Sequence, residues 1–514
     1  MTRPEGAAPS SAPAPRRWAP WHTALAVVAA ATVLRLVVGA RTPLVPDEAY
    51  YWDWSRRLAR GYFDHPPAIA VLIRLGTALF GDTPFGVRVL PILAGRATIL
   101  LVMSMARSAA GDRAALWVAL FDALMPLSAV GSMLATPDAP LLLATATALF
   151  AVWRAVSRSP ERRPGPLPWW LLAGLAVGAG LLSKYTAVLV AVGVLVALLA
   201  RPGLRRELRG PGPYAGAALA LGMFAPVVLW NAAHGWISFR FQLAHGLGPS
   251  PTSWLANEGA LLGGQLGLLS PILFPLFVLA VARTLRDRRS ADGLLLLGAV
   301  AATVFLAFVA SALRGPVEAN WPAPAYVPAM VVLASRPTTS GGRRWLVAGS
   351  ALAGVISLVL LVHLLRPFAF VPARRDPAAQ LAGWDTLASR VDAARATLPL
   401  RTQTRVAGAR YQDAAELAFH LPDHPSVLAV DPSGHRNQYD LWPTYPGLAR
   451  VGDDLVLVAG TGPQPDDDPI VRALAPHFAG TALGETVWIM RGGAARGVWV
   501  LRGWRGSWPS SLPR

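Results

Sequence analysis

The sequence predicts a mainly α-helical, polytopic membrane protein with about 11 spans and a small C-terminal α/β domain outside the membrane. Of its 514 residues, 54% are apolar and only 15% charged, whereas a soluble chain carries about 25% charge. Apolar runs long enough to cross a bilayer recur from Trp21 to about Leu365. From Arg366 onward the spans stop and polarity rises.

The amino-acid composition excludes some kinds of chemistry and binding partner. The absence of cysteine excludes disulfides and thiolate chemistry. The net charge of +18 comes from 47 basic and 29 acidic residues, but many of the arginines punctuate the apolar runs. Such a pattern indicates cytoplasmic loops, and we expect no nucleic-acid partner. The chain has a single lysine, Lys184.

The division expected from these patterns has three parts. Residues 1–20 are rich in Pro, Ala and Ser and are expected to be disordered and cytoplasmic. Residues 21–365 form the transmembrane domain, with an outer loop at 40–85. Residues 366–514 form the soluble extracytoplasmic domain. No convincing small-residue cleavage site follows the first apolar run, so it is interpreted as an anchor.

Basic loops orient the spans. The positive-inside rule places four arginine-rich loops in the cytoplasm, at residues 154–163, 201–209, 283–289 and 336–344. The short basic loop 107–113 adds a fifth. The crossings expected from these loops are 21–39, 86–106, 114–131, 139–154, 168–183, 185–200, 213–231, 258–282, 293–312, 323–335 and 345–365. The apolar stretch 68–80 is too short to cross about 30 Å of hydrocarbon, so it should lie at the interface.

With this orientation, polar residues near the span ends gather on the outer face. Charged groups at membrane depth are costly and usually line a cavity, so the sequence predicts one polar chamber there. Its members are Asp47, Glu48, Asp64, His65, Asp138, Lys184, His234, Arg240, His245, Glu318 and Asn320.

The first outer loop is the densest part of this chamber. Adjacent carboxylates at Asp47 and Glu48 point in different directions on a helix, so one could accept a proton while the other binds substrate or orients a loop. The alternative is that the pair caps a helix beginning at Pro46. Tyr50 and Tyr51, with Trp52 and Trp54, fit an interfacial aromatic belt or a sugar-stacking surface.

Four further residues, at three sites, also have two interpretations. Asp64 and His65 could ligate a divalent metal, or form a turn fixed by the two prolines that follow. Asp138 could be a second catalytic carboxylate or complement a helix dipole. Lys184 could contact a phosphate or snorkel to the interface, and the phosphate is favoured in a chain that otherwise uses arginine.

Two more outer segments contribute residues. Residues 230–242 alternate aromatic and polar groups, as expected of a loop over a lipid head group. Residues 318–326 place Glu318, Asn320 and Trp321 at the mouth of a proline-interrupted span.

Together these segments resemble the GT-C superfamily of integral-membrane glycosyltransferases, in particular family 39/83-like enzymes related to protein O-mannosyltransferases and 4-amino-4-deoxy-L-arabinose transferases of lipid A. The resemblance rests on PDEAYYWDWSRRLARGYFDHPP (46–67), ATPDAPLL (135–142), LLSKYTA (181–187), WNAAHGWISFRFQ (230–242) and VEANWPAPAY (317–326). In the tail, YQDAAELAFHLP and RNQYDLW match more loosely.

The resemblance implies transfer of a sugar from a polyprenyl-phosphate donor to an acceptor on the outer side of the cytoplasmic membrane. It implies catalytic roles for Asp47, Glu48 and Asp138. The donor phosphate would be bound by Lys184, Arg56, Arg57 and Arg240. Substrate contacts are expected from Tyr50, Tyr51, His234, Glu318, Asn320 and Trp321. Some relatives use a metal, here matched by Asp64 and His65 although the local pattern differs, so a divalent ion is the one cofactor expected.

The proposed sugar transfer requires cationic and acidic side chains of the kinds named above. A polyprenyl phosphate leaves as an anion and needs cations or a metal beside it, while a carboxylate takes the acceptor proton. The competing functions are a transporter or flippase for a polyprenyl-linked lipid, or an inactive scaffold. Transporters usually place charges at the membrane midplane, whereas here they lie at outer span ends.

The tail predicts a small α/β domain over the chamber. Short strands are expected at 405–408, 427–430, 455–458, 487–490 and 498–501, and helices at 382–398 and 411–421.

Overall fold

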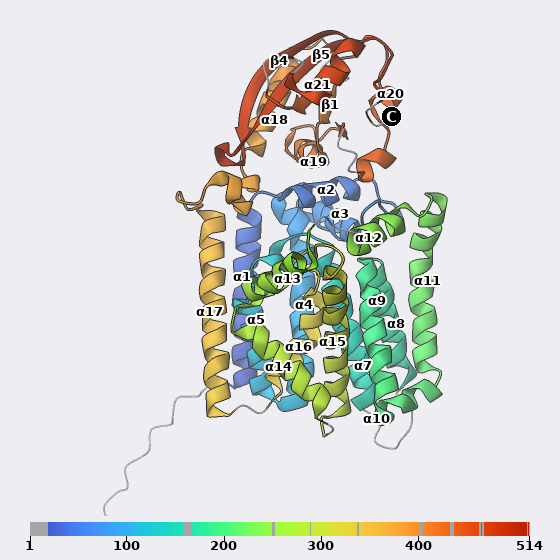
Figure 1. Ribbon diagram of the computed structural model, residues 1–514, viewed down its shortest axis with the longest axis vertical. Helices are drawn as coiled ribbons and strands as arrows, with labels where there is room; N and C mark the ends of the chain where they lie inside the picture. The colour runs from blue at the N-terminus through green and yellow to red at the C-terminus, as the bar shows by residue number, and fades with distance from the viewer. Residues whose placement is uncertain are drawn as a thin grey trace, which may run out of the picture.

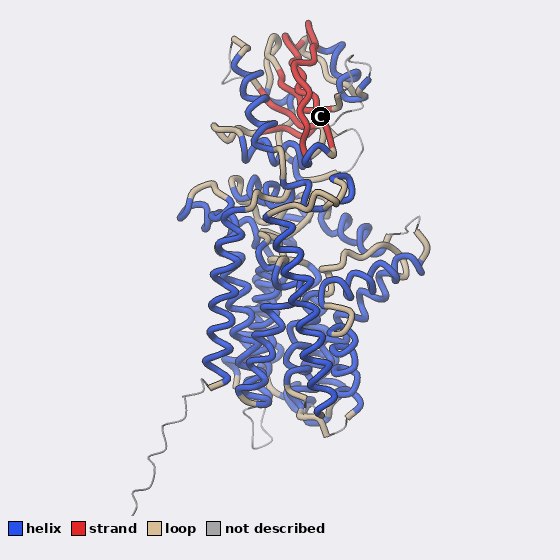
Figure 2. Tube along the Cα trace, turned by 90° about the vertical axis from the view of Figure 1, so that its left-hand side faces the viewer, coloured by secondary structure: helices blue, strands red, loops and turns tan. Residues whose placement is uncertain are grey.

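The computed structural model describes residues 19–157, 166–248, 252–287, 289–336, 339–399, 404–431, 436–461, 464, 467–510 and 512. Its architecture confirms the predicted fold class: a helical bundle carries a small sheet-containing domain on one end (Figures 1 and 2). The expectation of a disordered N-terminus falls almost wholly on residues 1–18, which lie outside the described ranges.

Long apolar helices form the bundle because each closes its own backbone hydrogen bonds, as a membrane requires. Within the described ranges, six helices are long and apolar enough to span a bilayer, or up to nine if each of three bent helix pairs is one span. The six are α1 (Pro20–Arg41), α4 (Pro84–Ala110), α7 (Asp138–Ser157), α11 (Gly212–Ala233), α15 (Asp292–Ala312) and α17 (Ser340–Leu365).

Shorter helices complete the bundle. They are α5 (Asp112–Leu124), α6 (Pro126–Ala129), α8 (Leu167–Leu181), α9 (Val188–Ala200), α10 (Pro202–Arg205), α13 (Trp254–Leu269), α14 (Leu273–Arg286) and α16 (Ala323–Ala334). Each of the 11 predicted crossings contains one of these helices or one of the long ones. The number of actual crossings stays a prediction.

Two predicted spans are not straight. The segment 258–282 divides into α13 and α14, which meet at 103°. At the break, Ser270 has a φ of 120°, and its hydroxyl accepts a hydrogen bond from the Leu273 amide at 3.1 Å. The segment 114–131 bends by 69° after α5, because Pro126 has no amide hydrogen with which to continue the helix.

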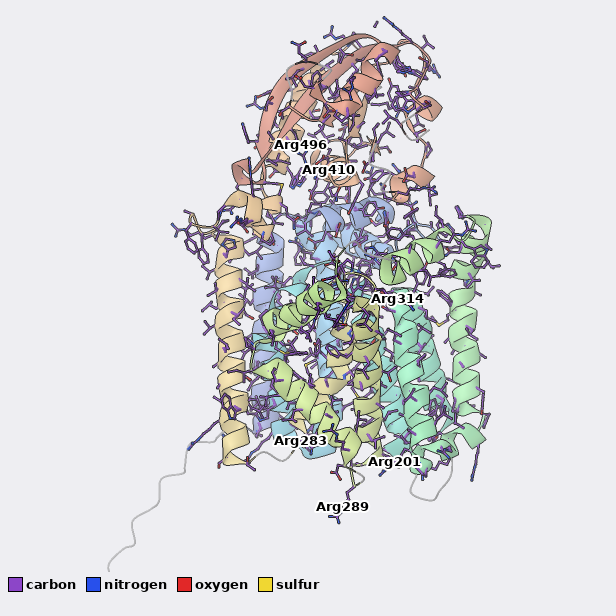
Figure 3. The ribbon with its side chains drawn as sticks, in the orientation of Figure 1. Arg201, Arg283, Arg289, Arg314, Arg410 and Arg496 are labelled. Carbon is purple, nitrogen blue, oxygen red and sulfur yellow. The ribbon has the colours of Figure 1, made fainter. Side chains whose placement is uncertain are left out.

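The described arginines of two basic loops, 201–209 and 283–289, lie at the end of the bundle opposite the C-terminal domain, whereas parts of the loops 154–163 and 336–344 lie outside the described residues. Figure 3 shows Arg201, Arg283 and Arg289 at the end far from the domain, while Arg314 lies in the half nearer to it. This arrangement agrees with the predicted separation of the arginine-rich loops from the outer chamber.

Short helices lie at the end of the bundle that faces the domain. They are α2 (Pro46–Ser55), α3 (Ala68–Phe80) and α12 (Ile237–Leu247) (Figure 1). The segment 230–242, expected as a loop, is instead the end of α11 and the start of α12. Positive φ angles of 64° at Gly235 and 60° at Trp236 make the sharp turn between them.

The C-terminal domain is built on a five-stranded sheet in the order β2-β1-β3-β5-β4. Its strands are β1 (Arg405–Gly408), β2 (Val427–Ala429), β3 (Leu455–Ala459), β4 (Phe478–Ile489) and β5 (Ala494–Trp504). Strand β1 runs parallel to both β2 and β3, whereas β5 runs antiparallel to both β3 and β4. Its helices are α18 (Trp384–Ala396), α19 (Tyr411–His420), α20 (Tyr445–Leu448) and α21 (Pro469–Leu474). The expected strands and helices are confirmed, although β4 and β5 are longer than the sequence indicated.

Candidate active site

Helix α2 divides the adjacent carboxylates Asp47 and Glu48 between two environments. Pro46 is well suited to the first helical position, and the Val45 amide donates to Glu48 Oε2 at 3.0 Å, which caps the helix. Consecutive helical residues point about 100° apart. As a result Asp47 is exposed, whereas Glu48 is completely buried.

Glu48 is held by a full set of partners. Arg88 of α4 donates to Glu48 Oε1 through Nε at 2.7 Å and to Oε2 through Nη2, and the Ala135 amide donates to Oε1 at 2.8 Å. The remaining Arg88 donors bind carbonyls at the end of α1 and in the following loop. Glu48 therefore joins α2 to the bundle and has no oxygen free for a substrate, so we do not assign it the catalytic role that the sequence suggested.

Asp47 faces the C-terminal domain. The hydroxyl of Tyr411, the first residue of α19, donates to Asp47 Oδ1 at 3.4 Å. The Asp47 side chain reaches solvent, but protein surrounds much of it. Exclusion of water raises the pKa of Asp47, the Tyr411 hydrogen bond opposes this rise, and the charges of Glu48 and Glu318 add to it. A carboxylate with a raised pKa suits a general base.

Asp138, Lys184 and Asn320 meet although they lie far apart in the sequence. Lys184 Nζ is 2.8 Å from Asp138 Oδ1, and Asn320 Nδ2 donates to Asp138 Oδ2 at 2.7 Å. The cluster joins the start of α7, the turn after α8 and the loop before α16. The Lys184 ammonium is thus paired with a carboxylate rather than free for a phosphate.

The predicted metal pair has other interactions. The Tyr50 hydroxyl donates to Asp64 Oδ2 at 2.7 Å. Burial raises the pKa of Asp64 to about 7, and burial together with the charges of Lys184 and His245 lowers the pKa of His65 to about 3. In the described ranges, no three His, Asp or Glu side chains are grouped so that they could hold a metal ion. Asp64 and His65 therefore have no third side-chain ligand grouped with them among the described residues.

A cationic cavity of about 590 Å³ lies between α12, the first outer loop and the C-terminal domain. Arg240 of α12 and Arg436 of the domain both line it. Phe63 and Phe241 supply apolar walls, with their ring centroids 5.0 Å apart. His234 also lines the cavity, with its ring stacked on Trp230 at 4.0 Å. The pairing of guanidinium groups with aromatic rings suits an anion attached to an apolar chain.

Arg56 and Arg57 bind the C-terminal domain instead of lining that cavity. Arg56 Nη2 donates to the His424 carbonyl at 2.5 Å, and Arg57 Nη2 donates to Ser426 Oγ at 2.7 Å. The Arg57 guanidinium also lies 4.1 Å from the centre of the Trp442 ring. These contacts give the two arginines a docking role, and we do not keep them as donor-phosphate ligands.

The other predicted substrate residues have mixed positions. Tyr50 and Tyr51 are almost fully buried, so most of their ring surface packs against protein. Trp321 packs against His245, with ring centroids 5.3 Å apart. Glu318 is exposed and close enough to Asp47 for their charges to interact.

The structure adds residues that the sequence did not single out. Arg88 holds Glu48, Tyr411 contacts Asp47 and Arg436 lines the cationic cavity. The Gln438 side-chain oxygen Oε1 accepts a hydrogen bond from the Phe63 backbone amide at 2.7 Å, and the Gln438 backbone amide donates to the Tyr50 hydroxyl at 2.6 Å. Tyr411, Arg436 and Gln438 belong to the two tail motifs, which were the available signal.

Comparison with known proteins supports the predicted resemblance to the GT-C superfamily of integral-membrane glycosyltransferases. Residues 64–230 match the family model described as dolichyl-phosphate-mannose-protein mannosyltransferase. The crystal structure of ArnT from Cupriavidus metallidurans in the apo state has the same fold, with a TM-score of 0.65 at 19% identity over 93% of this chain and 98% of that one. A second structure of that protein, bound to undecaprenyl phosphate, gives a TM-score of 0.62.

Two relatives are similar to this chain in sequence. The lipid A galacturonosyltransferase of Rhizobium johnstonii is 32% identical over 291 residues, which cover 56% of this chain and 59% of the relative. The undecaprenyl phosphate-alpha-4-amino-4-deoxy-L-arabinose arabinosyl transferase of Pseudomonas aeruginosa is 33% identical over 185 residues, 33% of each chain. The match thus spans less than two thirds of either relative.

Proposed function

We propose that the protein is a glycosyltransferase that moves a sugar from a polyprenyl-phosphate donor to an acceptor at the outer face of the cytoplasmic membrane. The observation that carries this proposal is the presence of Asp47, an accessible carboxylate, at the same end of the bundle as the cavity lined by Arg240 and Arg436. A base for the acceptor and cations for the leaving group are the two requirements of the reaction.

In the proposed reaction, Asp47 accepts the proton of the acceptor hydroxyl or amine. The acceptor atom forms a bond to the anomeric carbon of the sugar, while the bond from that carbon to the phosphate oxygen breaks. The polyprenyl phosphate leaves with the bonding electron pair, and Arg240 and Arg436 stabilise its negative charge. Electrostatic stabilisation of a leaving group of this kind lowers the barrier most when the cations are already in position.

Asp138 has a different part in this proposal. Lys184 and Asn320 occupy one oxygen each, so the group is an anchored polar wall rather than a free base. Such a wall can fix the orientation of a bound sugar through its remaining lone pairs and the amide of Asn320.

The substrate class follows from the relatives. The names of both relatives describe glycosyl transferases, one acting on lipid A and the other named for an undecaprenyl-phosphate sugar donor. We infer that the donor here is a polyprenyl-phosphate sugar and that the acceptor is a lipid A-type glycolipid in the inner membrane. Membrane lipids surround the bundle in this account.

A genetic test compares a deletion strain carrying wild-type protein with one carrying Asp47→Asn. Mass spectrometry of the envelope glycolipids should show one added sugar with the wild type and none with Asp47→Asn, together with accumulation of the lipid-linked donor. Asp112→Asn, in an exposed ion pair with Arg107 at the start of α5, is the matched control and should transfer normally. Sugar transfer by Asp47→Asn at the wild-type level would refute the assignment of the base.

A further inference from the structure

Helix α19 of the C-terminal domain lies directly on α2, which carries Asp47 (Figure 1). Aromatic rings fill much of this junction. The Tyr411 ring lies 4.8 Å from that of Tyr50, and Phe419 packs edge-on against Trp52 at 5.0 Å. Both contacts join α19 to α2, so the helix that carries the proposed base has a face covered by the domain.

Polar contacts fix the position of the domain as well. The Tyr439 hydroxyl donates to the buried Asp53 at 3.1 Å, and Gln438 is bonded to both Tyr50 and Phe63. Arg56 binds the carbonyl of His424. Together with the aromatic contacts to α19, these bonds connect the first outer loop to three separate segments of the domain. They therefore oppose small rotations of the domain on the bundle.

The first turn of α19 is also restrained from above. Arg410 bonds the buried Asp413 through Nε at 3.1 Å and Nη2 at 2.8 Å, and Arg496 of β5 bonds the same carboxylate at 3.1 Å. Figure 3 shows Arg410 and Arg496 in the domain above the bundle. Tyr411 directly follows Arg410, so its backbone is held at a defined height over α2.

We propose, building on the function proposed above, that the C-terminal domain completes the active site and that Tyr411 is a positioning residue for Asp47. Its hydroxyl donates to Asp47 Oδ1 and orients the carboxylate so that the other oxygen, Oδ2, faces the acceptor. The membrane bundle alone supplies the base, and the domain sets its direction and its basicity.

The electrostatic setting makes this contact consequential. The charged and titratable groups that act on Asp47 are Glu48 and Tyr51 from its own helix, Asp64 from the first outer loop, Glu318 from the loop before α16, and Tyr411 from α19. Glu48 and Glu318 oppose ionisation of Asp47, and the charge of Asp47 in turn raises the pKa of Asp64. Tyr411 favours ionisation, because a hydrogen bond to a carboxylate stabilises the charged form. Burial and the nearby carboxylates raise the pKa of Tyr411, so it remains a donor at neutral pH.

The test is the pH profile of sugar transfer by the full-length protein in detergent or nanodiscs, with the variant Tyr411→Phe. Phenylalanine keeps the ring that packs on Tyr50 and removes only the hydroxyl. Loss of one hydrogen bond to a carboxylate should move the acidic limb of kcat/KM to higher pH by about half a unit to one unit. We expect kcat to fall several-fold at neutral pH and the KM for the lipid donor to stay unchanged.

Tyr445→Phe is the matched control, because Tyr445 is a buried tyrosine of the same domain whose hydroxyl bonds the Asp453 carbonyl at 3.3 Å, away from α2. Its pH profile should match the wild type. Each profile is normalised to its own maximum, so a loss of folded protein lowers the curve without moving it. An unshifted acidic limb in Tyr411→Phe, with Asp47→Asn inactive, would overturn the role of Tyr411 and leave the proposed function intact. Full activity in Asp47→Asn would instead refute Asp47 as the base and with it the role of Tyr411, whereas the absence of sugar transfer by the wild type would refute the proposed function.

Discussion

Lys184 and Asp138 form an ion pair of 2.8 Å in which the side chains are only 11% and 14% exposed. The pair uses the single lysine of the chain to neutralise a carboxylate at the outer end of α7. The sequence favoured a lipid phosphate as the partner of Lys184. The ion pair indicates that its first role is to hold the outer segments together.

Replacing Lys184 by Met should therefore lower stability before it affects donor binding. In a double-mutant cycle with Asp138→Asn, measured by thermal unfolding in detergent, we expect a coupling energy of about 1–3 kcal/mol. Removing one partner leaves the other charge poorly solvated, whereas removing both does not. Additive effects of the two changes, together with a raised donor KM in Lys184→Met, would favour the phosphate-binding role instead.

The arginines of the cationic cavity should control the donor. Arg240→Gln and Arg436→Gln are each expected to raise the KM for the polyprenyl-phosphate sugar by about tenfold, because a charge-assisted contact to a phosphate contributes about 1.5 kcal/mol or more. Arg289→Gln, at the opposite end of the bundle, is the control and should leave KM unchanged. Steady-state kinetics at two salt concentrations would check this, since the wild-type KM should rise with salt more steeply than that of either cavity variant.

The ion pair between Arg88 and Glu48 should dominate the stability of the outer loop. Arg88→Met leaves the fully buried Glu48 carboxylate without its cation, and we expect a loss of about 3–5 kcal/mol. Arg107→Met breaks the exposed pair with Asp112 and should cost less than about 1 kcal/mol. Thermal unfolding of both variants gives the comparison. Equal losses would show that the Glu48 carboxylate is solvated in the protein.

A pH dependence of stability should arise from Glu416 of α19. Burial raises the pKa of Glu416 to about 7, above its ordinary value of 4.5. Between these values the folded state holds a proton that the unfolded state has lost, so stability falls as pH rises from about 4.5 to 7, by up to about 3 kcal/mol. His420 Nε2 lies 3.2 Å from Glu416. Burial lowers the pKa of His420, but Glu416 and Asp385 raise it by more, so the net pKa is raised and His420 also loses stabilisation as pH rises.

Glu416→Gln should flatten that decline. The observable is the difference in unfolding free energy between wild type and variant from pH 5 to pH 7.5, in which contributions from other groups largely cancel. Parallel curves over this range would contradict the assignment of the raised pKa to Glu416.

Hydrophobic periodicity and the placement of arginines were enough to predict the helical bundle, the end that carries the chamber and the α/β tail. These features depend on local composition and on the cost of burying charge in lipid. The break at Ser270 and the turn at Gly235 were not predictable in this way, since each depends on a backbone conformation that leaves no mark on apolar periodicity.

In the candidate site, too, some features could be predicted from the sequence and others could not. Asp47, Asp138, Lys184, Arg240 and Asn320 could be predicted to gather at the outer face because charged groups at membrane depth are costly and usually line a cavity. Their pairing could not, because Asp138 and Asn320 are separated by 182 residues. The docking role of Arg56 and Arg57 was also hidden, since it depends on how the C-terminal domain lies on α2.

The most direct test of the central claim is release of polyprenyl phosphate by the purified protein. Wild type and Asp47→Asn are reconstituted in nanodiscs with an undecaprenyl-phosphate sugar and a lipid A acceptor, and free undecaprenyl phosphate is measured with and without acceptor. The account predicts acceptor-dependent release by the wild type and a reduction of at least about 100-fold in Asp47→Asn, the loss expected on removing a general base. Release by Asp47→Asn at the wild-type rate would contradict it.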